Sequence, residues 1–152
     1  MYQTFIFLHS FFRWFVVLSL LCALLRAMEG YRSGRSFSAT DNAVRHWTAT
    51  IAHIQLVLGI MVYIKSPVVH YFWRNFREAI GIWSITFFAL FHFAAMLAAI
   101  VLVTIGSALA KRRPGDRAKF RTLFIWFGIA LVLIILAIPW PFSPLAQRPY
   151  LR

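Results

Sequence analysis

The sequence has only one cysteine and few acidic residues, and each scarcity excludes a kind of site. Cys22 is the single cysteine, so an intrachain disulfide, a CxxC metal site and haem attachment through CxxCH are excluded. Any cofactor must therefore be held noncovalently or by other ligands. The four acidic residues are scattered and offer no carboxylate pair for acid–base catalysis. They are Glu29, Asp41, Glu78 and Asp116.

Motifs of hydrolases, nucleotide-binding proteins and nucleic-acid-binding proteins are also missing. The chain has no Ser/His/Asp arrangement and no glycine loop for phosphate. Its net charge is +12, but the basic residues cluster between long apolar runs. A nucleic-acid-binding module would instead spread them over one water-exposed face, among polar residues that contact bases. We therefore expect no nucleic-acid partner and no independent enzymatic activity.

Apolar residues are what the sequence has in abundance. They make up 61% of the 152 residues, and the mean hydropathy is +0.73. A soluble domain of this size could not bury so much apolar surface. A membrane-spanning helix needs about 20 apolar residues, and four segments reach or approach that length. The sequence thus predicts one all-α domain over residues 1–152, an integral membrane four-helix bundle. Its spans are expected at about residues 5–25, 44–64, 80–110 and 123–138.

The first apolar segment and the distribution of basic residues bear on topology. That segment is about twice as long as a signal-peptide core and has no basic residue before it, so we expect it to remain in the protein. Ten Lys and Arg lie around the first and third connections, against five on the opposite side. Because cytoplasmic loops are enriched in these residues, we expect both termini on the periplasmic side. The ten are Arg26, Arg32, Arg35, Arg45, Lys111, Arg112, Arg113, Arg117, Lys119 and Arg121, and the five are Lys65, Arg74, Arg77, Arg148 and Arg152.

Three further stretches carry local signals. Residues 65–78 combine aromatic and basic residues. This suits a segment lying on the outer headgroups, or an irregular loop whose rings anchor the neighbouring spans. Pro114 and Gly115 predict a break between the last two spans. The stretch IPWPF (138–142) ends the last span, since a proline has no helix N–H donor.

Histidines within the spans are the main functional candidates, because an ionisable residue is costly inside a bilayer. His53 is 11 residues from Ile64, and His92 is 12 residues from Ile80. At the rise of a helix they lie roughly 16 Å and roughly 18 Å from the same membrane surface. Such a pair on facing helices could hold a b-type haem, with one axial ligand on each side of its plane.

The small residues around His92 fit haem binding, and they also fit simple helix packing. Ala89, Ala95 and Ala99 lie along the helical face of His92 and would leave room for a flat macrocycle. A small-residue pattern on the same helix is explained by helix packing alone; it consists of Ala94, Ala95, Ala98 and Ala99. The histidines could then be structural, bonded to Thr50, to Gln55 or to a backbone carbonyl of a neighbouring helix.

His9 and Arg13 are four residues apart and share one face of the first span. Arg13 is predicted roughly 12 Å deep, so we expect its guanidinium to meet a haem propionate or a lipid or quinone head. A backbone carbonyl or an acid of a partner subunit is the alternative. His46 is expected near the cytoplasmic boundary. His70 lies in the outer connection and could approach His9 in a second metal or haem site.

Four stretches resemble a family of small membrane proteins. They are HSFFRW (9–14), AHIQLVLGIMVY (52–63), LVTIGSALAKR (102–112) and IPWPF (138–142). In this order they are similar to four-span proteins of Bacteroidota and relatives that are labelled cytochrome b or cytochrome b-like. The resemblance implies a multi-pass protein of the bacterial inner membrane and points to His9, His53 and His92. One departure is Phe91, because the family usually carries a glutamate before this histidine. Any role of that acid in cofactor binding or proton transfer is then in doubt.

The leading hypothesis is a b-type cytochrome-like electron-transfer subunit. One haem would lie between His53 and His92, and Arg13 would neutralise a propionate or a quinone head. Electrons would pass between membrane quinol and a partner redox protein. The alternative is a cofactor-free accessory subunit of a larger respiratory or other membrane complex. Expected partners are the lipid bilayer and either other membrane subunits or further copies of the chain. A transporter is less favoured, since no pair of broken helices is evident.

Overall fold

A computed structural model of the chain describes residues 1–140, which form helices and short connections without a strand. Pro141, Phe142, Arg148 and Arg152, which entered the predictions above, lie outside the described residues. The long helices are α1 (Tyr2–Ser33), α2 (Ala39–Lys65), α6 (His92–Arg112) and α7 (Asp116–Ala137). Between α2 and α6 lie α3 (Pro67–Arg74), α4 (Phe76–Ala79), α5 (Trp83–Thr86) and the π-helix η1 (Phe87–Phe91).

Within residues 1–140, four helical stretches are long and apolar enough to cross a membrane: Tyr2–Ser33, Ala39–Lys65, Trp83–Arg112 and Asp116–Ala137. This confirms the predicted all-α, four-helix membrane bundle. The third span begins at Trp83 and not near Ile80, because α4 and a turn precede it. The fourth begins at Asp116, so its first turns carry charged residues that a search for apolar runs leaves out. The periplasmic placement of both termini stays a prediction.

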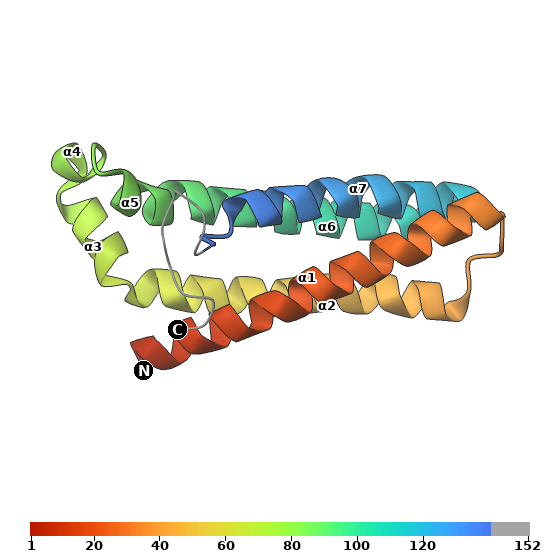
Figure 1. Cartoon of the computed structure of the whole chain (residues 1–152), viewed down its shortest axis with the longest axis horizontal. Helices are drawn as coiled ribbons and strands as arrows, with labels where there is room; N and C mark the ends of the chain where they lie inside the picture. The colour runs from red at the N-terminus through yellow and green to blue at the C-terminus, as the bar shows by residue number, and fades with distance from the viewer. Residues whose placement is uncertain (141–152) are drawn as a thin grey trace.

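The four long helices run antiparallel in sequence order (Figure 1). Helix α1 packs against α2 and α7, while α6 packs against α7 and α2. The cross-section is therefore a ring in which α1 and α6 lie diagonally opposite. Side chains that point inward from α1 and α6 meet at the centre of the bundle.

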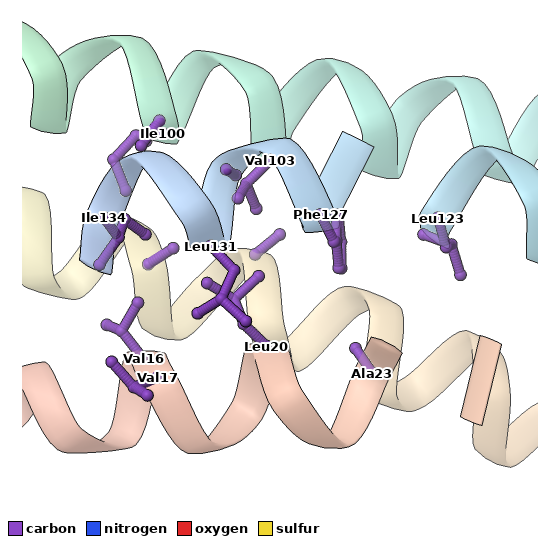
Figure 2. Close-up of a cluster of buried hydrophobic side chains, with 14 of the residues drawn as sticks. Val16, Val17, Leu20, Ala23, Ile100, Val103, Leu123, Phe127, Leu131 and Ile134 are labelled. Carbon is purple, nitrogen blue, oxygen red and sulfur yellow. The ribbon is translucent and has the colours of Figure 1, made fainter. Parts of the chain in front are cut away.

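One half of the bundle is closely packed, and we call it the packed end. It is built around the fully buried side chains of Leu20, Val103 and Phe127. Figure 2 shows α1 residues such as Leu20 facing Phe127 and Leu131 of α7. A Cβ added at Gly106 would lie 2.3 Å from Trp126 Cβ, so only glycine allows α6 and α7 to approach this closely.

The connection between α1 and α2 is fixed by local signals at this end. Gly34 ends α1 in the left-handed conformation, with a φ of 70°, which glycine adopts without strain. Ser38 and Asp41 form a capping box at the start of α2. The buried Asp41 carboxylate also pairs with Arg26, at 2.8 Å, and with Arg35. The ends of α1 and α2 are thereby tied together.

Helix α3 covers the opposite end of the bundle. Pro67 occupies its first turn, and the Ser66 side chain accepts a bond from Val69 N, as is typical of a helix start. Val69 and Phe72 are buried, whereas Trp73 is exposed. Residues 65–78 thus contain an amphipathic helix and not an irregular loop throughout. That α3 lies on outer headgroups stays a prediction.

Candidate functional site

A cavity of about 200 Å³ lies inside the half of the bundle that α3 covers, which we call the cavity end. Residues of α1, α2, α3, η1, α6 and the end of α7 line it. Most of the lining is apolar, including Ile6, Leu56 and Met96. The exceptions are polar side chains that come together from different helices. Among them are His9, Ser10 and Arg13 of α1, Gln55 and Tyr63 of α2, and His92 of α6.

His9 and His92 face each other in this cavity. Their ring centroids are 6.4 Å apart, and the ring planes are inclined by 77°. His92 Nδ1 lies 2.8 Å from the carbonyl oxygen of Ala137. Because a carbonyl can only accept, Nδ1 carries the proton of this bond. In the neutral ring Nε2 then keeps its lone pair, which is the state that a metal ligand requires.

The ring of His9 is held by two residues of α2. Gln55 Nε2 donates to the His9 carbonyl at 2.9 Å and lies 3.2 Å from His9 Nδ1. Gly59 lies against the same ring, because a Cβ added there would be 3.2 Å from His9 Cε1. Gln55 Oε1 is buried and has no hydrogen-bond partner among residues 1–140. An amide and a glycine thus fix His9 from one side.

Arg13 lines the cavity one helical turn after His9. Its guanidinium carbon is 5.6 Å from the ring centroid of Trp14 and 5.9 Å from that of Trp140. Both distances are within the range of cation–π attraction. The two tryptophans also contact each other, at 5.9 Å between ring centroids. A positive charge is therefore held at the cavity by aromatic rings.

His53 does not belong to this cavity. It is exposed on the outside of α2, with Nδ1 2.7 Å from the Ala49 carbonyl and Nε2 3.1 Å from Thr104 Oγ1. Thr104 lies twelve residues beyond His92, or roughly 18 Å along α6. The structure therefore does not bring His53 and His92 together.

His53 and His92 lie at different depths in the bundle because of the way the third span begins. Tyr63, near the end of α2, contacts the Ala89 carbonyl and the Phe93 ring. Helix α5 and η1 pack against α3, so they extend past the end of α2. Depth counted from Ile80 consequently placed His92 too far from that end. His9 occupies the position facing His92 that the sequence predicts for His53.

The remaining sequence candidates lie elsewhere. His46 is exposed beside Trp47, and His70 is exposed with Nε2 2.9 Å from the Ile64 carbonyl. Neither lines the cavity. Within residues 1–140, no three His, Cys, Asp or Glu side chains group as a metal site.

Two features of the site were missed from the sequence. Tyr63 had no predicted role, and Gln55 was expected only as a possible hydrogen-bond partner of a structural histidine, although their spacing of eight residues places them on one helical face. The π-helix Phe87–Phe91, which directly precedes His92, has no strong sequence signal. Such π-turns often occur at functional sites.

Fold and cavity define the class of this protein: a multi-pass helical membrane protein with two histidines facing each other inside the bundle. No family model matches the chain, and no curated protein or solved structure matches it significantly. The resemblance to cytochrome b-like proteins stays a prediction.

Proposed function

We propose that this protein is a membrane electron-transfer subunit that binds one b-type haem between His9 and His92. The facing imidazoles carry this proposal. Since a metal–nitrogen bond is about 2 Å long, two imidazoles that share one iron have centroids about 6 Å apart. The observed separation is 6.4 Å. The bond from His92 Nδ1 to a carbonyl is also the second contact usual for metal-binding histidines.

The donor set suits a b-type haem: His9 and His92 would supply the two imidazoles that hold it, and the haem would supply one-electron transfer. The cavity of about 200 Å³ is smaller than the 300–1,000 Å³ of typical ligand sites. Binding therefore requires flexible lining side chains such as Leu56 and Met96 to move outward. Arg13 would neutralise a propionate, and the apolar lining would exclude water from the haem.

The proposed setting is the bacterial inner membrane, with both termini and the cavity end on the periplasmic side. The basic connections would then face the cytoplasm. Membrane quinol and a partner redox protein are the proposed electron donor and acceptor. The small cavity favours one alternative, a cofactor-free accessory subunit of a larger membrane complex. In that case His9 and His92 would serve only to hold the helices together.

A difference spectrum distinguishes these functions. The protein, purified from haem-replete cells, should show a b-type α band in the reduced-minus-oxidised spectrum. His9→Ala and His92→Ala should each lower bound haem at least about tenfold, because one axial ligand is lost. His53→Ala is the matched control and should keep the band, since His53 lies outside the cavity.

Two results would contradict the haem proposal. A folded, colourless wild-type protein that takes up no added haem would favour the accessory subunit. Loss of the band in His53→Ala but not in His9→Ala would show that the haem ligands are His53 and His92, as expected from the sequence, and not His9 and His92.

A further inference from the structure

Tyr63 joins the end of α2 to the start of the third span. Its hydroxyl donates to the Ala89 carbonyl at 3.0 Å and accepts from Trp73 Nε1 at 3.1 Å. Its ring lies 4.4 Å from the Phe93 ring between centroids. Ala89 is fully buried, so the Tyr63 hydroxyl satisfies a carbonyl that water cannot reach.

The carbonyl that Tyr63 holds belongs to the π-helix before His92. Ala89 lies in the middle of Phe87–Phe91, and the His92 backbone N–H bonds to the Phe87 carbonyl across this turn. A π-turn contains one residue more than an α-turn. If it reverted to α-helix, His92 would rotate by about 100° relative to the preceding helix. The geometry of η1 therefore sets the side on which His92 projects.

The Tyr63 hydroxyl is not available to a ligand in the cavity. A phenol has one proton to donate, and in Tyr63 that proton is used by the Ala89 carbonyl. Its acceptor side is occupied by the Trp73 indole of α3. Although Tyr63 lines the cavity, its hydroxyl acts on the backbone of η1.

We propose that Tyr63 is a positioning residue for His92: its hydroxyl holds the Ala89 carbonyl in the π-turn and so fixes the direction of the His92 imidazole. This inference rests on the proposed function only where it concerns the haem. The bond from His92 Nδ1 to the Ala137 carbonyl fixes the ring itself. His92 is thus held twice, through its backbone by Tyr63 and through its ring by α7.

The test compares Tyr63→Phe with Tyr71→Phe. The first change removes the hydroxyl and keeps the ring on Phe93. The second removes a hydroxyl from an exposed tyrosine of α3. Nitrogen-15 NMR of the haem-free protein, labelled in its five histidines, reports the imidazoles directly. We expect Tyr63→Phe to shift the His92 signals and to leave those of His53 unchanged, while Tyr71→Phe shifts neither.

Haem-loaded protein gives a second measurement. If His9 and His92 hold the haem, its low-spin ferric EPR signal would depend on the relative orientation of their imidazoles. Tyr63→Phe should then move this signal and keep the haem content within about twofold of wild type. Unchanged His92 NMR signals, or equal shifts of all five histidines, would overturn the inference. If the wild-type protein binds no haem, the proposed function fails, while the NMR result still decides the role of Tyr63.

Discussion

The packed end and the cavity end of the bundle use helix contacts in opposite ways. At the packed end, Gly30 and Gly106 bring large rings of α7 against the backbones of α1 and α6. At the cavity end, polar side chains project into a space of about 200 Å³. Unfilled space costs stability, since its lining loses packing contacts. The difference indicates that close packing at the packed end holds the fold, whereas the cavity end leaves unfilled space among its polar side chains.

Two arginines, one at each end of the bundle, have different surroundings. At the packed end the buried Arg45 bonds to the Ser107 carbonyl and hydroxyl and to Asn42 Oδ1. Such a hydrogen-bonded charge is typical of a structural role. At the cavity end, Arg13 rests on tryptophan rings beside the cavity, where an anionic group could also approach it.

The largest loss of stability should follow a clash at the packed end. In Gly106→Ala the new Cβ would meet Trp126 Cβ at 2.3 Å, and this atom is too close to its own backbone to move aside. We expect the free energy of unfolding in mixed micelles to fall by about 3 kcal/mol, as in other overpacked cores. Gly115→Ala is the control, because nothing lies within 4 Å of its Cβ. Equal losses in both variants would contradict the assignment of stability to the packed end.

A smaller loss should follow removal of the Asp41 carboxylate. It accepts bonds from Arg26, Arg35 and Ser38, so Asp41→Ala breaks both the cap of α2 and its link to α1. We expect about 2 kcal/mol of destabilisation, with haem content per folded protein unchanged. Asp116→Ala is the matched control, because that carboxylate is 41% exposed. This variant should lose much less stability than Asp41→Ala. A loss of haem in folded Asp41→Ala would show that the two ends are coupled.

The smallest change in stability should come at the cavity end. In Gly59→Ala the new Cβ lies 3.2 Å from His9 Cε1, so the imidazole must shift by a few tenths of an ångström. We expect the stability to change by less than about 1 kcal/mol, since alanine also favours the helix. Haem affinity, measured by titration, should fall roughly tenfold, equivalent to about 1.4 kcal/mol. Gly128→Ala meets only Leu24 Cδ2 at 3.8 Å and should leave the affinity unchanged.

Much of the fold could be predicted because its signals are local. Long apolar runs predict the spans, since the bilayer must be crossed by about 20 apolar residues. Pro114 and Gly115 correctly predict the break before α7. Spacing also placed His9 and Arg13 on one face of α1, where the structure has both lining the cavity.

What the sequence by itself determined is therefore the number of membrane-spanning helices, their apolar character and the identity of the polar residues within them. The partner of His92 was decided only by the tertiary structure. It depends on how far α5 and η1 extend past α2 beside α3, and on a π-turn that Tyr63 stabilises from another helix. These are contacts between distant segments, and counting residues along one helix cannot reveal them. For that reason His53 was predicted opposite His92, where the folded chain has His9.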